Sequence, residues 1–278
     1  MRQLALAGMV ALALCACGRD AASTTEPRTT ADPGTGAPVA TGQAGPAPVP
    51  VALDDVMERD PRYLIGISYP PVARAHPGLA RLLQAYARSA RAELMQAVEG
   101  LGDTKPTMPY DLSLAFTELV ATPQVVAVAA DGSSYTGGAH GNPLVARFTW
   151  LPGSNERLTA AKLVPTEAGW RVVSAYVREQ LATDLSQRVE ASGYPPDERA
   201  QLLEGGLQMI DQGTAPDPAN FDQFEPVLDG DGRITALRFV FPPYQVGPYS
   251  DGTQYAEVPA RVLLPVVAPG YRHLFQGG

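Results

Sequence analysis

Cysteine is almost absent from this chain of 278 residues. Both cysteines lie near the N-terminus, at Cys15 and Cys17. The body that follows therefore offers no disulfide, no thiol nucleophile and no cysteine ligand for a metal.

Histidine is nearly as scarce, and the common catalytic motifs are missing. The three histidines are His76, His140 and His273, far apart in sequence and outside any HExxH pattern. A zinc site needs three or four ligands, so we expect no metal and no cofactor. The chain has no P-loop, no GxGxxG and no GxSxG.

Two segments come near to a catalytic or metal-binding pattern without completing it. Ser133 and Ser134 lie close to His140, but closeness in sequence is not the geometry of a catalytic triad. The segment "DGDGRI", residues 229–234, resembles part of a calcium loop. Its outer ligand positions hold Val227 and Arg238, so a hairpin turn explains it better. We therefore expect a protein that is not an enzyme.

Basic residues are outnumbered, with 21 Lys and Arg against 29 Asp and Glu, a formal charge of −8. Nucleic-acid binding draws its affinity largely from Lys and Arg on phosphates, so this balance argues against that class. A cationic protein is the partner that long-range attraction would favour.

Long hydrophobic runs are also lacking. Leu4–Leu14 is too short to span a bilayer and follows the positive charge of Arg2, as in an export signal. It ends in "LCACG", which fits the bacterial lipobox with Cys17 as the lipidated residue and 1–16 as the signal peptide. By resemblance to Gram-negative lipoproteins, Gly18 after that cysteine favours the periplasmic face of the outer membrane. An ordinary secretory signal is the alternative.

The rest of the chain divides by composition. Residues 17–52 are rich in Ala, Thr, Pro and Gly, which predicts a disordered tether. From there on, apolar residues recur at helical spacing over about 77–98 and 167–189, and a shorter helix is predicted up to about Ile210. Strand patterns fill much of the remainder, including a strand predicted over Tyr255–Leu264. Because helices do not alternate strictly with strands, we expect an α+β fold with antiparallel sheets and packed helices. Two domains are predicted, 53–165 and 166–278.

The segment "YTGGAHGN" joins two predicted strands. Gly137 and Gly138 permit a positive φ, and Asn142 precedes a proline, which favours extended backbone. One interpretation is a tight turn that His140 holds together. Another is a contact surface that includes Tyr135, His140 and Asn142, and a third makes His140 a general base.

A second candidate surface is "PPYQVGPYSDG", residues 242–252. Proline restricts the backbone, and tyrosine offers a large contact area with a polar tip. We expect Tyr244, Tyr249 and Asp251 to contact a partner, with Asp251 facing a basic group. The alternative is a connection whose tyrosines pack on the protein's own core.

Two stretches resemble known domains. "SYTGGAHGNPLVARFTWL" with "RLTAAKLV" is similar to the non-catalytic domain of PdaC-type peptidoglycan deacetylases. Residues 239–264, with the pattern Tyr-x-x-Gly-Pro-Tyr-x-x-Gly, resemble the C-terminal domain of RsiV-like anti-sigma factors, a domain of unknown function. The sigma-binding region and membrane helix of those factors, and the deacetylase domain, have no counterpart in this sequence.

The resemblance implies a cell-envelope binding module without a catalytic residue of its own. RsiV-like proteins bind lysozyme, so lysozyme or a related cationic muramidase is the expected partner. A peptidoglycan-binding accessory protein and an envelope hydrolase that uses His140 are the alternatives.

The first testable prediction concerns the anchor. Mass spectrometry of the mature N-terminus should find a diacylglyceryl group on Cys17, and Cys17→Ser should release the protein from the membrane fraction. An unmodified N-terminus further along the chain would contradict this prediction.

Overall fold

The computed structural model describes residues 51–278, so the predicted signal peptide, Cys17 and nearly all of the predicted tether lie outside the described residues. No helix in the described part of the chain is long and apolar enough to span a bilayer.

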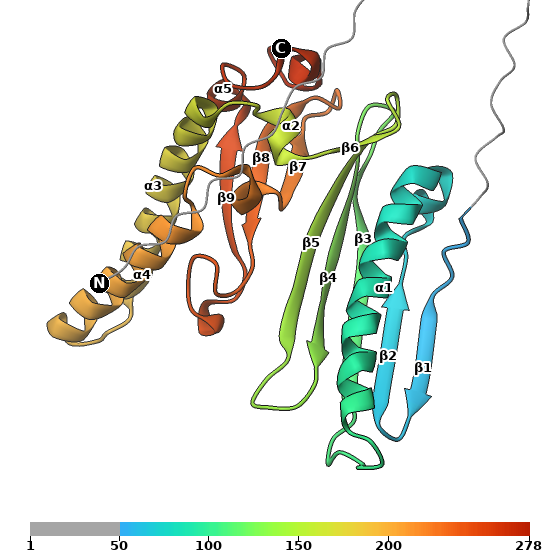
Figure 1. Cartoon of the computed structure of the whole chain (residues 1–278). Coiled ribbons are helices and arrows are strands. Elements are labelled where there is room, and N and C mark those ends of the chain that lie inside the picture. Colours follow the sequence, from blue (N-terminus) through green and yellow to red (C-terminus); the bar gives the residue numbers. More distant parts are fainter. Residues whose placement is uncertain (1–50) are drawn as a thin grey trace, which may run out of the picture. The chain divides into compact units, whose positions relative to one another are not determined.

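A six-stranded sheet occupies the first half of the described chain, with its strands in sequence order (Figure 1). The strands are β1 (Val56–Asp60), β2 (Tyr63–Ser68), β3 (Tyr110–Ala121), β4 (Val126–Tyr135), β5 (Asn142–Leu151) and β6 (Glu156–Leu158). All neighbours are antiparallel except β2 and β3, which are parallel. The parallel pair follows from the long crossover that joins β2 to β3 through a helix.

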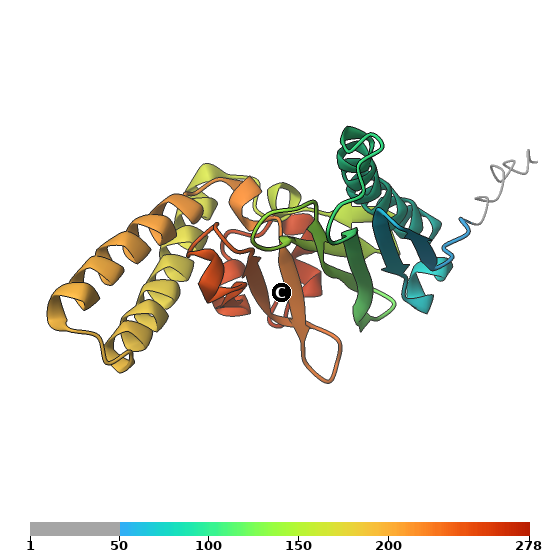
Figure 2. The ribbon, with the colours of Figure 1, turned by 90° about the horizontal axis from the view of Figure 1, so that it is seen from below.

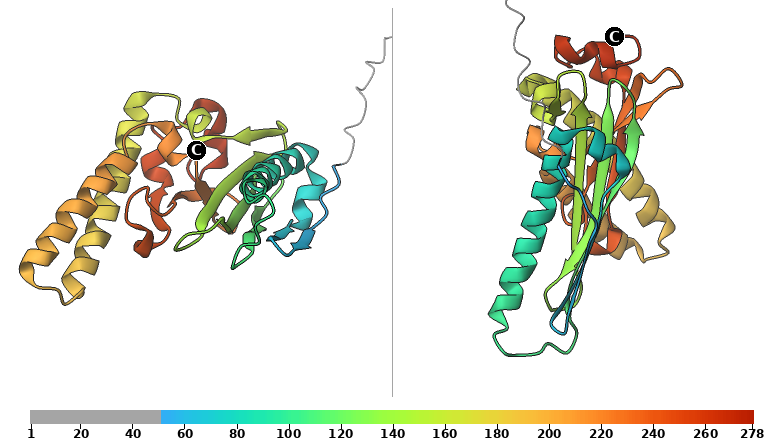
Figure 3. Two further views of the ribbon diagram at one scale, coloured as in Figure 1. Left: turned by 60° about the horizontal axis from the view of Figure 1, so that its bottom comes forward. Right: turned by 90° about the vertical axis from the view of Figure 1, so that its right-hand side faces the viewer.

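That crossover helix is α1 (Pro77–Gly100), which forms a layer beside the sheet (Figure 3). A short 3-10 helix, η1 (Pro71–Ala75), leads into it. Leu79, Leu83 and Leu94 recur at helical spacing and are fully buried. They join Leu112 and Leu114 of β3 in one hydrophobic cluster.

The second half of the chain forms a three-stranded antiparallel sheet with a helical hairpin (Figure 2). Its elements are α2 (Ala160–Leu163), α3 (Glu167–Ala191), α4 (Pro196–Gly213), η2 (Pro218–Phe221), β7 (Phe224–Leu228), β8 (Ile234–Phe241), η3 (Tyr249–Asp251), β9 (Gln254–Pro259), α5 (Ala260–Leu263) and η4 (Pro269–Leu274). Trp170 of α3 stacks on Phe221 with 5.1 Å between ring centroids, inside a second hydrophobic cluster.

The α+β fold with antiparallel sheets is confirmed. One strand prediction was too long: the chain leaves β9 at Pro259 and turns into α5, where a continuous strand to Leu264 was expected. Pro259 ends the ladder because it has no N–H to donate and precedes a helical turn. The boundary between the two predicted domains, at residues 165 and 166, stays a prediction.

One buried arginine joins the two sheets. The Arg147 side chain of β5 is 4% exposed, and its Nε donates to Glu225 Oε1 of β7 at 2.6 Å. Its Nη1 donates to Asp131 Oδ1 of β4 at 2.9 Å. The Arg147 backbone N–H also donates to Gln223 Oε1 at 2.6 Å. A buried charge must be paired in this way, because an unpaired one is costly.

We expect Arg147→Met to lower the free energy of unfolding by about 2–4 kcal/mol, since it leaves the Glu225 carboxylate, only 12% exposed, without its closest partner. Denaturant unfolding measures this loss. Arg171→Met is the matched control, because it removes an exposed ion pair with Glu167 and should change stability far less. Equal effects of the two substitutions would show that the Arg147 contacts do not stabilise the fold.

Candidate functional site

The β4–β5 loop, residues 136–141, is a glycine turn at the end of two long strands. Gly137 and Gly138 have φ angles of 98° and 97°, which confirms the expected need for glycine there. Asn142 is extended in β5 and opposite Ser134. Tyr135, half-buried at the end of β4, donates its hydroxyl to the Gly138 carbonyl at 3.3 Å, so it supports the loop.

His140 is exposed at the tip of this loop. Its Nδ1 lies 3.1 Å from the Gly141 carbonyl oxygen, and its Nε2 lies 3.4 Å from the Tyr244 hydroxyl. The imidazole stacks on the Tyr249 ring with 4.0 Å between centroids and 18° between planes. Within residues 51–278 its ring nitrogens thus meet a carbonyl and a phenol, whereas a triad base would be oriented by a carboxylate.

The β8–β9 loop, residues 242–253, supplies the two tyrosines. Tyr244 has a φ of 73°, which is uncommon for a residue with a Cβ. Its N–H donates to the Gly247 carbonyl at 3.0 Å, and the next residue, Gln245, holds the loop through its amide to the Gly213 and Asn220 carbonyls at 3.0 and 2.9 Å. A fixed loop therefore keeps Tyr244 in a strained conformation.

The three rings form one exposed group, here called the aromatic platform: His140, Tyr244 and Tyr249. The two tyrosine rings lie 5.7 Å apart, and the Tyr249 hydroxyl donates to the Gly141 carbonyl at 3.4 Å. Tyr244 is 56% exposed and Tyr249 is 37% exposed. Residues more than a hundred positions apart in sequence thus present a joint aromatic surface.

Asp251 takes part in a different contact. Its Oδ2 lies 3.3 Å from Arg188 Nη2 of α3, so the basic group that we expected a partner to supply is present within the chain. The structure therefore brings together His140, Tyr244 and Tyr249, with Tyr135 supporting their loop, and gives Asp251 an internal partner.

Asp111 is a residue that the sequence did not single out. It is the second residue of β3, paired in register with Leu64 of β2 and Tyr135 of β4. Partial burial raises the pKa of the Asp111 carboxyl above its usual range. No motif marks this position, because its neighbours come from strands that are distant in sequence.

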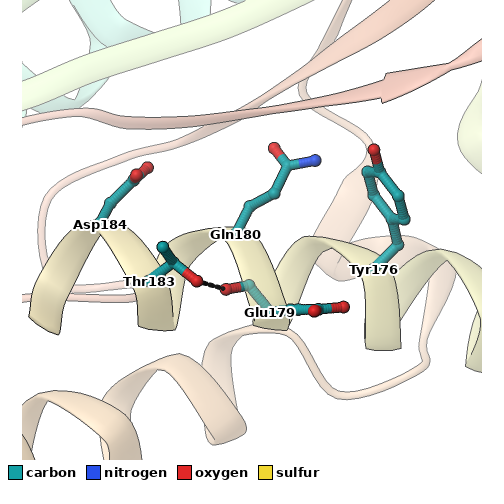
Figure 4. A pocket seen from close by; sticks show the side chains of 5 residues that line it. All are labelled: Tyr176, Glu179, Gln180, Thr183 and Asp184. Carbon is teal, nitrogen blue, oxygen red and sulfur yellow. Dashed lines mark hydrogen bonds between the residues drawn. The ribbon is translucent and has the colours of Figure 1, made fainter.

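A shallow groove of about 340 Å³ lies along α3 (Figure 4). Tyr176, Glu179, Thr183 and Asp184 line it, together with Gln180. The Gln180 amide donates to the Glu257 carbonyl at 2.7 Å and accepts from its N–H at 3.2 Å, so it satisfies part of the free edge of β9. Among residues 51–278 no cluster of three potential metal ligands is found.

By its fold, the protein belongs to the α+β class with antiparallel sheets, and it carries an exposed aromatic platform. No protein-family model matches the chain, and no curated protein matches it. Similar solved structures include a DUF3298 family protein from Pseudomonas aeruginosa PAO1, with a TM-score of 0.47 and 17% identity over 81% of this chain and 96% of that chain.

A member of the same family from Bacteroides fragilis NCTC 9343 has a TM-score of 0.46 and 14% identity, over 81% of this chain and 97% of that chain. Its neighbours therefore come from a family known as a domain of unknown function. Both TM-scores are below 0.5, so these likenesses carry no argument about activity. The more specific resemblance to RsiV-like and PdaC-type domains, made from the sequence, stays a prediction.

The raised pKa of Asp111 gives a pH-dependent prediction. The folded pKa lies above the unfolded value of about 3.9, so the folded state holds the proton more tightly and loses stability as the pH rises through the folded pKa. Asp111→Asn removes this penalty and should raise the unfolding midpoint at pH 7, with the gain vanishing below about pH 4.

Thermal unfolding between pH 3 and 8 measures the effect. Asp103→Asn is the control, because Asp103 lies in an exposed turn after α1, where a substitution should change the midpoint at pH 7 far less. A loss of stability in Asp111→Asn at pH 7 would mean that the carboxylate has a stabilising partner, contrary to this account.

Proposed function

We propose that this protein is a lipid-anchored protein on the periplasmic face of the outer membrane, and that its aromatic platform binds a partner without catalysing a reaction. The partner that we favour is lysozyme or a related cationic muramidase. The anchor part of the proposal rests on the lipobox cysteine, Cys17.

The observation that supports the proposal most strongly is the positive φ angle of the exposed residue Tyr244. A residue with a Cβ at positive φ costs about 1–2 kcal/mol, and such strain tends to persist at functional positions. Burial does not explain this cost, because the side chain is 56% exposed. A large contact surface held ready for a partner does explain it, since a fixed loop loses little entropy on binding.

Charge supports a cationic partner. The chain has a formal charge of −8, which draws basic proteins toward it at low salt. Exposed tyrosine faces also attract Lys and Arg side chains directly, and buried interface centres are rich in tyrosine and arginine. Peptidoglycan is the second candidate, because the platform offers flat apolar faces with hydroxyl tips that a polysaccharide can contact.

The test replaces Tyr244 by glycine. Glycine relieves the positive φ, so Tyr244→Gly should fold at least as stably as the wild type. Its affinity for lysozyme should nevertheless fall tenfold or more, because the contact surface is removed. Tyr249→Ala should weaken binding likewise, and binding of the wild type should weaken as salt rises.

Tyr255→Ala is the matched control, since Tyr255 of β9 is 48% exposed but does not belong to the platform. Binding to purified sacculi is measured in parallel: binding of sacculi alone would replace the muramidase by peptidoglycan. Wild-type affinity for both ligands in stably folded Tyr244→Gly would remove the platform from the site. Loss of a peptidoglycan-cleaving activity in His140→Ala would instead favour the hydrolase.

A further inference from the structure

A second candidate site lies on the other side of the β8–β9 loop from the platform. A cleft of about 550 Å³ is enclosed by α3, α4 and this loop. That volume is within the usual range for small-molecule sites. Its walls are mainly apolar and come from three segments: Leu185, Val189, Leu202, Met209, Val246 and Pro248.

Two adjacent glycines of α4, Gly205 and Gly206, line the cleft and leave it without side chains there. A Cβ on Gly206 would lie 2.6 Å from Leu185 Cδ2, so the absence of a side chain there lets α3 and α4 approach closely. A Cβ on Gly205 would meet no atom within 4 Å, so Gly205 leaves free space. Glycine in the middle of a helix costs about 0.5–1 kcal/mol relative to alanine, which makes two in succession unusual without a packing or binding role.

The guanidinium of Arg188 in α3 also lines the cleft. Arg188 Nη1 donates to Gln254 Oε1 at 3.0 Å and Nη2 to Asp251 Oδ2 at 3.3 Å, while the Arg188 side chain remains 47% exposed. A guanidinium has five N–H groups, so these two bonds leave three donors for a ligand. The forked arrangement of such donors fits a carboxylate.

We propose that this cleft binds a small amphipathic carboxylate, with its apolar chain along α4 and its carboxylate on Arg188. From Leu202 to Met209 the apolar wall extends over seven helical steps, roughly 10 Å at 1.5 Å per step. A medium-length alkyl chain suits that length and the volume of the cleft. The site is separate from the aromatic platform, so it does not depend on the proposed function.

The charge of Asp251 distinguishes a carboxylate ligand from a neutral one. The Asp251 carboxylate already accepts one N–H of Arg188, so a ligand carboxylate on the remaining donors would be repelled by this like charge. Removing the charge of Asp251 should therefore strengthen the binding of a carboxylate, and it should leave a neutral ligand of the same length unaffected.

The test uses the full chain with Cys17→Ser, so that no lipid is attached, and three probes of one length: octanoate, octanol and octylammonium. Octanoate should give saturable shifts of the Gly205 and Gly206 amide resonances, with octanol weaker and octylammonium weakest. Arg188→Met should weaken octanoate tenfold or more and leave octanol unchanged. Asp251→Asn should tighten octanoate several-fold.

Gly205→Phe should block both octanoate and octanol by filling the cleft, while Gln208→Phe, on an exposed position of α4 outside the cleft, should block neither. The absence of saturable shifts in the wild type would overturn the proposal. Equal binding of octanoate by Arg188→Met and the wild type would overturn it as well. Weaker octanoate binding by stably folded Asp251→Asn would show that no ligand carboxylate lies close to the Asp251 charge, and would overturn the proposal.

Discussion

The pairing of one buried charge underlies the arrangement of the described chain. Arg147 has two carboxylate partners, Asp131 beside it in the same sheet and Glu225 in the other sheet, while its side chain is only 4% exposed. A guanidinium cannot lose its charge at ordinary pH, so it must keep its partners wherever it is buried. Arg238 extends this contact, 3.6 Å from Glu225 and 2.6 Å from Glu257, so charges alternate from β4 to β9.

The aromatic platform depends on that pairing. With β5 held against β7, the loop that begins β5 meets the loop that follows β8, and His140 stacks on Tyr249 at 4.0 Å. None of the three rings is buried enough to be held by the hydrophobic effect alone. The contacts between them are each worth about 0.5–1.5 kcal/mol, which is too little to bring two sheets together. The two sheets therefore determine where the three rings lie, and the contacts between the rings only adjust their relative orientation.

The β8–β9 loop connects the two proposed sites. Tyr244 and Tyr249 belong to the platform, while Val246, Pro248 and Asp251 line the cleft against α3 and α4. The Arg188 contact with Asp251 and the Gln245 contacts with Gly213 and Asn220 fix the loop from the helical side. The Arg188–Asp251 contact is therefore shared by the wall of the cleft and by the loop that carries the platform tyrosines.

Local structure could be predicted from the sequence, because helices and turns depend mainly on residues that are close together in the chain. Helical spacing predicted α1 and α3, and the pair Gly137-Gly138 predicted a turn with positive φ. Tyrosines and prolines marked residues 242–252 as a candidate contact loop. The contact of Tyr244 with His140 could not be predicted, because no spacing in the sequence shows which loops of two different sheets come together. The internal partner of Asp251 and the raised pKa of Asp111 were hidden for the same reason. Charge pairing and burial between distant segments exist only once the chain has folded, so the tertiary structure alone decided them.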